Sequence, residues 1–287
     1  MAERGSGRLE ARGLGKVFRM RNGLRITTVH AVREASFTVE AGRTVALVGE
    51  SGSGKSTIAR MLTKLERPTR GEVLIDGVPA AHHGRGLARY RRDVQMVFQD
   101  PFGSLNPFHT IRHHLERPVR IHHPHLGSAE VRARVAELLD RVQLSGSKRF
   151  AESRPHELSG GQRQRVAIAR ALAPGSRFIV ADEPVSMLDV SIRLGVLNLL
   201  ADLQREEGLG VLYITHDLAT ARHFSDEILV MLRGEIVERG DADAVILHPQ
   251  HDYTKLLLEA AADPDRLGLL RDEVRAGAQT GPADAVG

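Results

Sequence analysis

The sequence predicts an α/β fold, with a mixed β-sheet core, an antiparallel β layer and an inserted helical subdomain. Short apolar runs at 44–48, 178–181 and 211–214 are typical of strands that are buried on both faces of a parallel sheet. Helical patterns separate these runs, as expected where helices connect parallel strands. Two alternating segments near the N-terminus, at 8–19 and 28–39, predict the antiparallel layer.

In chain order, the first part of the sequence contains mainly strands. The turn-like residues 21–23 join the two antiparallel strands. A helix is expected from Ile58 to Glu66, after the buried strand and a Gly-rich loop. Residues 72–76 and 94–98 have the composition of further strands.

The middle of the chain becomes helical from about residue 108. Ser128 is a plausible N-cap for an amphipathic helix. Apolar residues recur after it at helical spacing, at Val131, Val135, Leu138, Leu139 and Val142. Further helices are expected from Gly160 to Ala173 and over 190–206.

We expect one domain over 8–262, with the helical subdomain inserted at about 100–172. The segment 263–287 is rich in Ala, Gly, Asp and Pro and is expected to be a loose C-terminal tail. The absence of cysteine excludes disulfides and thiolate metal sites. Because no apolar run is long enough to cross a bilayer and no secretory signal is visible, we expect a cytoplasmic protein.

The distribution of charge and of histidine predicts neither nucleic-acid binding nor metal binding. The formal net charge is +4, but Arg is dispersed among Glu and Asp, which argues against nucleic-acid binding. Histidine runs at 82–83, 113–114 and 122–125 are typical of solvated loops. Adjacent histidines point in different directions and no acid lies at ligand spacing, so metal binding is not expected there.

A Gly-rich loop lies between the strand at 44–48 and the helix that follows. It matches G-x-x-x-x-G-K-[ST] and consists of Gly49, Glu50, Ser51, Gly52, Ser53, Gly54, Lys55 and Ser56, followed by Thr57. In such a loop the backbone N–H groups surround phosphate oxygens, and the helix N-terminus adds partial positive charge. Lys55 would reach the β- and γ-phosphates and Ser56 would hold Mg²⁺. The pattern predicts a P-loop NTPase core that binds a nucleoside triphosphate.

Two acids end the strand at 178–181. Asp182 is placed to bind Mg²⁺ through water, since parallel sheets bind ligands at this edge. Glu183 could act on an attacking water, which suggests a dedicated hydrolase. An acidic strand-to-loop junction is also common in proteins, and the presence of Lys55 is what favours the functional interpretation.

Residues 158–162, Leu-Ser-Gly-Gly-Gln, resemble the signature of the ATP-binding cassette (ABC) proteins at every position, and residues 163–172 resemble its continuation. The signature opens a helix whose N-terminus is an anion site without a phosphate in its own chain. The resemblance implies that the nucleotide site of a second, head-to-tail subunit is completed by Ser159, Gly160, Gly161 and Gln162.

The same resemblance implies roles for single residues. Gln99 looks like the glutamine that senses the γ-phosphate and Mg²⁺ and links to a membrane subunit. Asp189 resembles the end of the loop that crosses the dimer interface, where Met187 departs from the usual small residue. His216 looks like the switch histidine at the γ-phosphate. Phe18 is similar to the aromatic that stacks on adenine, although a lone Phe on a strand is usually a core residue.

A finer resemblance, to the oligopeptide/dipeptide importer branch, covers about 8–262 and is carried by residues 98–107, 183–186 and 248–255. It implies an ATPase, with ATP and Mg²⁺, that drives peptide uptake from the cytoplasmic face of the plasma membrane. A nickel or metal-chelate importer is the alternative, followed by a soluble non-transport ABC ATPase acting on nucleic acid. The implied partners are a second ABC ATPase subunit (in a heterodimer), two membrane permeases and, indirectly, an extracytoplasmic solute-binding protein.

Overall fold

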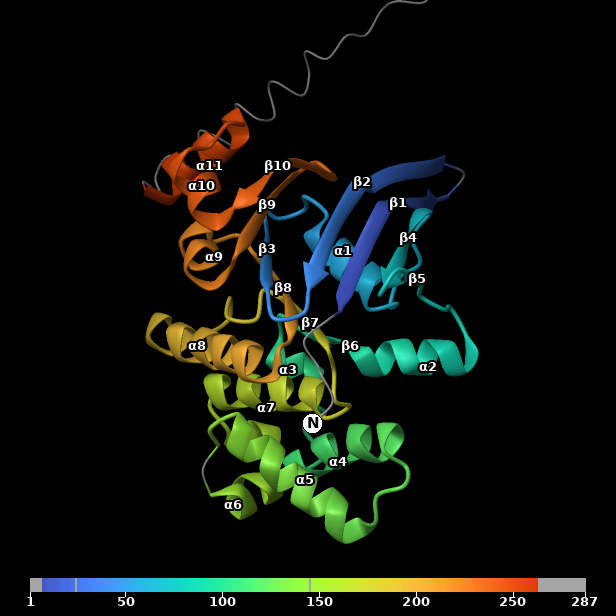
Figure 1. Ribbon diagram of the computed structural model, residues 1–287, viewed down its shortest axis with the longest axis vertical. Coiled ribbons are helices and arrows are strands. Elements are labelled where there is room, and N and C mark those ends of the chain that lie inside the picture. Colours follow the sequence, from blue (N-terminus) through green and yellow to red (C-terminus); the bar gives the residue numbers. More distant parts are fainter. Residues whose placement is uncertain (1–6, 24, 145, 263–287) are drawn as a thin grey trace, which may run out of the picture.

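The computed structural model describes residues 7–23, 25–144 and 146–262, so the tail expected over 263–287 lies outside the described residues. Ten strands of the described part form one mixed sheet, in the order β5-β4-β1-β2-β10-β9-β3-β8-β7-β6 (Figure 1). Its central part is parallel, and pairs β9 (Glu227–Leu232), β3 (Thr44–Val48), β8 (Gly210–Thr215), β7 (Phe178–Asp182) and β6 (Val94–Val97). The predicted α/β class is confirmed.

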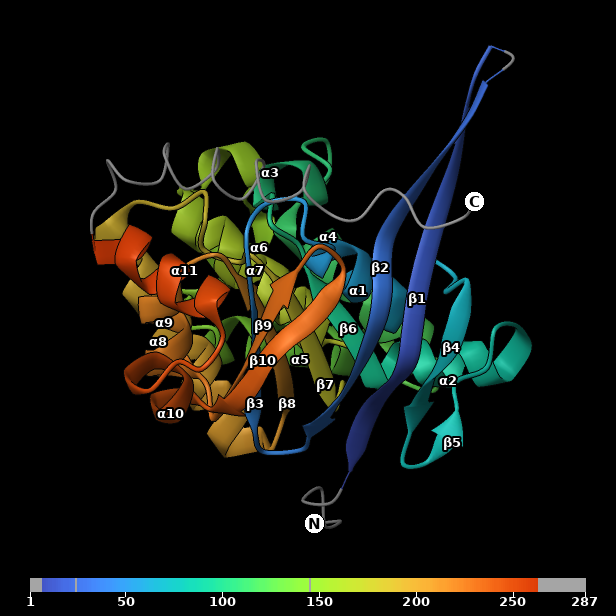
Figure 2. The same cartoon turned by 90° about the horizontal axis from the view of Figure 1, so that it is seen from above.

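The antiparallel layer is a long ribbon. β1 (Arg8–Asn22) pairs with β2 (Arg25–Glu40) along almost its whole length, and also with β4 (Arg70–Ile75), which carries the short β5 (Val78–Pro79). Figure 2 shows the end of the ribbon projecting away from the rest of the molecule. β10 (Glu235–Asp241) joins the two layers, because it pairs antiparallel with β9 and parallel with β2.

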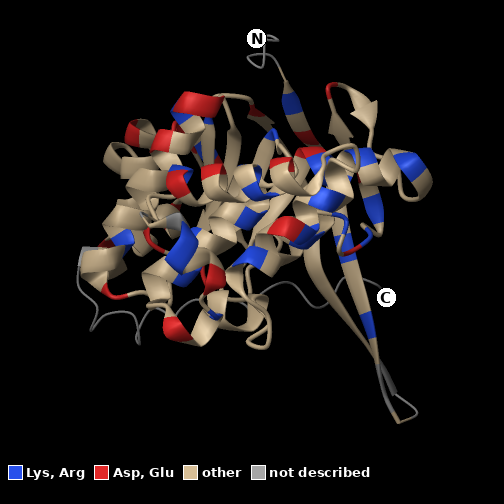
Figure 3. Ribbon diagram, turned by 90° about the horizontal axis from the view of Figure 1, so that it is seen from below, with Lys and Arg blue, Asp and Glu red and all other residues tan. Residues whose placement is uncertain are grey.

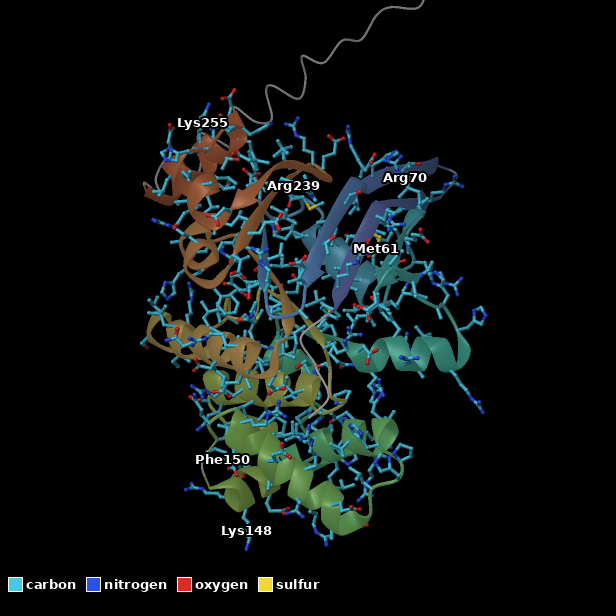
Figure 4. The ribbon with its side chains drawn as sticks, viewed as in Figure 1. Met61, Arg70, Lys148, Phe150, Arg239 and Lys255 are labelled. Atoms are coloured by element: carbon cyan, nitrogen blue, oxygen red, sulfur yellow. The ribbon has the colours of Figure 1, made fainter. Side chains whose placement is uncertain are left out.

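The central strands separate two hydrophobic cores. Because side chains alternate along a strand, Val45 and Leu47 of β3 face one core, whereas Ala46 and Val48 face the other. The first core contains α1 (Lys55–Leu62) and its buried Met61, labelled in Figure 4. The second is covered by α7 (Gly160–Leu172) and α8 (Val190–Glu207).

The helices between β6 and β7 form the end of the molecule opposite α11 in Figure 1. They are α3 (Pro101–Ser104), α4 (Ile111–His122), α5 (Ser128–Arg141), α6 (Ser147–Glu152), η1 (Pro155–Glu157) and α7. The predicted apolar face of α5 is buried. The predicted N-cap, Ser128, is wrong: the cap is Gly127, whose N–H donates to Glu130 Oε2 at 2.7 Å.

Other elements differ from the sequence expectations. α1 begins at Lys55 rather than Ile58 and ends at Leu62, where Thr63 donates its hydroxyl back to the Ala59 carbonyl at 2.8 Å. The unpredicted elements are α2 (Gly84–Asp93), β5, β9, β10, α9 (Leu218–Phe224), α10 (Ala242–Leu247) and α11 (Asp252–Ala262). Along the ribbon in Figure 3, Lys and Arg are interspersed with Asp and Glu. Among the described helices, none is long and apolar enough to cross a membrane.

Candidate nucleotide site

The predicted chemistry-bearing residues meet at one edge of the parallel sheet. β3 leads into the Gly-rich loop, Gln99 follows β6, Asp182 ends β7 and His216 follows β8. Since these four strands are parallel neighbours, their carboxyl ends lie together. The sheet order therefore brings side chains from four distant segments into one site.

The loop turns so tightly from β3 into α1 that two positions require glycine. At Gly49 a Cβ would collide with the carbonyl oxygen of Met231. At Gly54, where φ is 112°, a Cβ would collide with the carbonyl oxygen of Ala31. The loop consequently lies against the neighbouring backbone and leaves the start of α1 open to a ligand.

Lys55, the first residue of α1, is 4% exposed. Its Nζ donates to the carbonyl oxygens of Gly49 and Glu50, at 2.6 and 2.8 Å. Burial lowers the pKa of Lys55, although the charges of Glu183, Asp182 and Glu50 oppose this. The hydroxyl of Ser53 is also buried and lacks a hydrogen-bond partner among the described residues. A buried ammonium and an unpartnered donor fit a phosphate chain.

Ser56 and Asp182 supply oxygen ligands beside this cation. The Ser56 hydroxyl donates to Asp182 Oδ1 at 3.2 Å, and Asp182 is only 6% exposed. Burial raises the pKa of Asp182, although the Ser56 hydrogen bond opposes this. Hydroxyl and carboxylate oxygens are the ligands that Mg²⁺ prefers, usually with waters and phosphate oxygens, so the pair fits this ion.

Glu183 lies between an amide and an imidazole. Its Oε2 accepts from Gln99 Nε2 at 2.9 Å, and its Oε1 lies 3.4 Å from His216 Nδ1. Its φ of 45° is in the left-handed region, which residues other than glycine rarely adopt, and its N–H donates to the Ile214 carbonyl at 2.9 Å. The two side-chain contacts hold the carboxylate between Gln99 and His216.

The signature residues form a separate feature at the start of α7. Ser159 caps the helix by accepting from the Gln162 N–H at 3.3 Å, and Gln162 Oε1 accepts from the Ser159 N–H at 2.9 Å. A Cβ at Gly161 would collide with Ile192 of α8, while Gly160 is half-buried. The described contacts of these residues are therefore with one another, with Leu188 and with α8. Asp189 is exposed and is the N-cap of α8.

Phe18 lies on the ribbon, opposite Val29 and half-buried. The ammonium of Lys16 is 4.9 Å from its ring centroid, and the same ammonium donates to Glu66 Oε1 at 2.5 Å. Phe18 is thus neither a core residue nor in contact with the sheet-edge cluster. Its adenine-stacking role stays a prediction.

Tyr253 contacts the phosphate loop, and the sequence did not predict this contact. The N–H of Glu50, in the phosphate loop, donates to its hydroxyl oxygen at 3.1 Å. The two residues are 203 positions apart, and nothing local in the sequence signals the contact.

A groove of about 1140 Å³ opens beside Ser56, Gln99 and Asp182. One wall belongs to α4, so the solvated loops expected at 113–114 and at His122 are wrong. His113, His114 and His122 lie in this helix and line the groove. The rings of His109 and His113 stack with centroids 4.0 Å apart, and burial lowers the pKa of His114. Within the described ranges, no group of three or more His, Cys, Asp or Glu could hold a metal ion.

Comparison with known proteins identifies the class to which this fold and site belong. The family model described as ABC transporter matches residues 32–186. The chain therefore belongs to the ABC transporter family, in which it is an ATP-binding domain. The ATP-binding proteins of this family are ATPases. This confirms the family that the signature and the phosphate loop predicted.

Among individual proteins, the chain is similar to the glutathione import ATP-binding protein GsiA. It is 48% identical to the protein of Salmonella typhimurium and 47% to that of Escherichia coli K12, in each case over 265 residues. These matches cover 90% of this chain and 42% of the relative, so the chain spans less than half the length of these relatives.

Two solved structures share the fold. The dimeric ATP-binding cassette MJ0796, in a post-hydrolysis state bound to ADP and Pi, is 34% identical with a TM-score of 0.71, over 82% of this chain and 98% of that one. The cbiO1 protein of Clostridium perfringens, part of the ABC transporter complex cbiONQ, is 25% identical with a TM-score of 0.72. That match covers 92% of this chain and 98% of the cbiO1 chain.

The burial of Asp182 gives a test in the nucleotide-free protein. Because its pKa is raised above the usual 3.8, the native state binds this proton more tightly than the unfolded chain does. Ionisation therefore costs stability as the pH rises above that value. We expect Asp182→Asn to raise the Tm at pH 7, with a gain that shrinks toward pH 4, as measured by thermal denaturation across this range.

The matched control is Asp140→Asn, which removes the same charge from an exposed position on α5. It should leave the Tm within about 2 °C of the original at every pH, since surface substitutions are usually nearly neutral. An Asp182→Asn protein that is no more stable than the parent at pH 7 would show that Asp182 carries no such cost.

Proposed function

We propose that this chain is the ATP-hydrolysing subunit of an ABC importer, which couples the binding and hydrolysis of MgATP to the uptake of peptides through partner permeases. One observation carries the proposal: Glu183 is fixed between Gln99 and His216, beside the buried Lys55 and the Ser56–Asp182 pair. A phosphate-binding cation, metal-binding oxygens and a candidate base therefore lie at one sheet edge. These are the parts that triphosphate hydrolysis requires.

In this proposal each side chain has a separate task. The ammonium of Lys55 has three donors, of which two go to the carbonyls of Gly49 and Glu50, so the third can reach phosphate oxygens and compensate the cost of its burial. Glu183 polarises the attacking water, and its contacts with Gln99 and His216 hold it toward the γ-phosphate. Mg²⁺, held by Ser56 and through water by Asp182, would neutralise charge on the phosphate oxygens.

The second half of the nucleotide site would come from another cassette. The start of α7 offers the N–H groups of its first turn and the Ser159 hydroxyl, and among the described contacts of these residues none is with the phosphate loop of their own chain. A head-to-tail partner would bring its γ-phosphate to Ser159 and Gly161, and the dimeric state of the cassette MJ0796 supports such pairing. We propose a heterodimer, with Asp189 near the interface and Phe18 on the adenine.

The groove beside Gln99 would receive a cytoplasmic segment of a permease. α3 forms part of its wall and begins two residues after Gln99. The guanidinium of Arg163 on α7 lies 4.1 Å from the ring centroid of Phe102 on α3, and Arg170 donates to the Ser104 carbonyl at 2.5 Å. The groove wall and the signature helix would consequently move together, which links nucleotide state to the permease.

The remaining parts of the proposal concern cargo, place and boundaries. The relatives named glutathione import proteins support a peptide cargo, since glutathione is a tripeptide. The ATPase would act at the cytoplasmic face of the plasma membrane, with two permeases and indirectly a solute-binding protein. We propose a single domain over 8–262, with the helical subdomain at about 100–172.

Replacement of the candidate base tests the hydrolytic step. We expect Glu183→Gln to lower kcat for ATP hydrolysis about 10²- to 10⁴-fold, because the amide cannot accept a proton from the attacking water. ATP affinity should persist, since Lys55 is untouched. Phosphate release and nucleotide binding are measured on the complex with its permeases. Glu206→Gln, on the exposed side of α8, is the control, and a Glu183→Gln protein that hydrolyses ATP like this control would refute the role.

Replacement of the helix cap tests the shared site. Ser159→Arg should prevent ATP-driven association of two cassettes, because a bulky side chain would occupy the place of the partner's phosphate. Nucleotide binding by each monomer should remain. Association of the Glu183→Gln background is followed by light scattering with and without ATP. Ser128→Arg makes the same change at the start of α5, and equal ATP-driven association of both variants would exclude the composite site.

Uptake assays test the cargo. Cells that lack this chain should take up labelled glutathione and other short peptides at least about tenfold more slowly, since an importer without ATP hydrolysis has no driving force. The parent chain should restore uptake, and Glu183→Gln should not. If the parent chain instead restored the uptake of nickel and not that of peptides, the peptide cargo would be refuted in favour of a metal importer.

A further inference from the structure

The last described helix, α11, reaches the phosphate loop through one buried hydroxyl. Tyr253, the second residue of α11, is 4% exposed and belongs to the same core as Val48 at the end of β3. Its hydroxyl oxygen accepts from the N–H of Glu50 at 3.1 Å. Lys255 on the same helix is exposed and points outward in Figure 4, so α11 presents Tyr253 inward.

The peptide unit between Gly49 and Glu50 connects Tyr253 to Lys55. Its N–H donates to Tyr253, and its C=O, at Gly49, accepts from Lys55 Nζ at 2.6 Å. A trans peptide unit is planar, so its N–H and C=O point in opposite directions. A hydroxyl that fixes the N–H therefore also fixes the carbonyl that faces the lysine.

This N–H depends on Tyr253 for its partner. Glu50 follows the last residue of the β3 ladder by two positions and precedes α1, so neither element provides an acceptor for it. A backbone N–H that is left unpaired in a buried place is costly. The carbonyl of Glu50 accepts from Lys55 Nζ at 2.8 Å and from the Ser53 N–H at 3.2 Å, so loss of this anchor would disturb the whole first half of the loop.

The chain around Tyr253 is itself fastened to the sheet. Glu238 of β10 accepts from the N–H groups of Gln250 and His251, at 2.7 and 3.0 Å. Burial raises the pKa of Glu238, but these hydrogen bonds outweigh it and hold that pKa below its usual value. The N–H of Tyr253 donates to His251 Nδ1 at 3.1 Å. Through these contacts β10 sets the position of the tyrosine relative to β3.

We infer that Tyr253 is a positioning residue for the phosphate loop: it orients the Gly49–Glu50 peptide, and through it Lys55, toward the β- and γ-phosphates. The inference deepens the proposed nucleotide site and rests on it. Burial raises the pKa of Tyr253 to about 12, so the hydroxyl stays protonated over the working range of pH. The α11 helix thereby acts on nucleotide affinity without touching the nucleotide.

The test is Tyr253→Phe in the full chain, with binding of ATP, ADP and AMP measured by calorimetry or competition. The Kd for ATP and ADP should rise about fivefold to tenfold, because the part-buried N–H of Glu50 loses its partner and Lys55 its fixed carbonyl. The Kd for AMP should stay within about twofold, since the P-loop lysine reaches only the β- and γ-phosphates. The kcat at saturating MgATP should also persist, because Glu183 is untouched.

Tyr90→Phe is the matched control. Tyr90 is also buried, and its hydroxyl donates to the carbonyl of Leu62, at the opposite end of α1 from Lys55. Both variants should lose stability to a similar extent, but only Tyr253→Phe should weaken ATP and ADP binding. Unchanged ATP affinity in Tyr253→Phe, equal weakening in both variants, or equal loss for AMP would overturn the inference. A parent chain that binds no nucleotide would overturn the proposed site together with it.

Discussion

The buried charge of Lys55 is the constraint around which the site is arranged. The lysine keeps a lowered pKa because burial outweighs three nearby acids, and in the described structure two backbone carbonyls are its only hydrogen-bond acceptors. Asp182 is buried on the other side with a raised pKa. Each group is costly alone in a low-dielectric place, and each lowers the cost of the other. A triphosphate with a divalent ion would supply the opposite charge to both.

The fold provides the rigid frame that such charges require. β3, β7 and β8 are buried along their whole length, and their neighbours in the sheet are parallel. Their carboxyl ends are therefore fixed by the two cores rather than by the loops. Around them the structure keeps unfavourable features, such as φ of 45° at Glu183 and the hydroxyl of Ser53, which has no hydrogen-bond partner within the described ranges. Strain of this kind persists only where the surrounding packing enforces it.

The sequence predicts those parts of the site that depend on neighbours in the chain. The β3 strand, the phosphate loop and the Asp182–Glu183 pair were visible, because strand, turn and helix start follow one another locally. The contacts of Glu183 with Gln99 and His216 were not, because they depend on strand order in the sheet. The same holds for Tyr253 and Glu50, and for the histidines of α4. The N-cap at Gly127 was missed because the Glu130 side chain, rather than a residue's own propensity, selects it.

The site is connected to three other parts of the molecule. β10 and α11 position the loop through Tyr253, while α3 extends from Gln99 into the groove and is held to α7 by Arg163. The signature at the start of α7 is closed by its own cap and by the close packing of Gly161 on α8. The chain therefore contains both a buried cation, at Lys55, and a capped helix start, at Ser159. Under the proposed function, the phosphate loop of one cassette and the signature of a second cassette bind the same triphosphate. The groove, which is linked to α7 through α3, would then change position when the two cassettes associate.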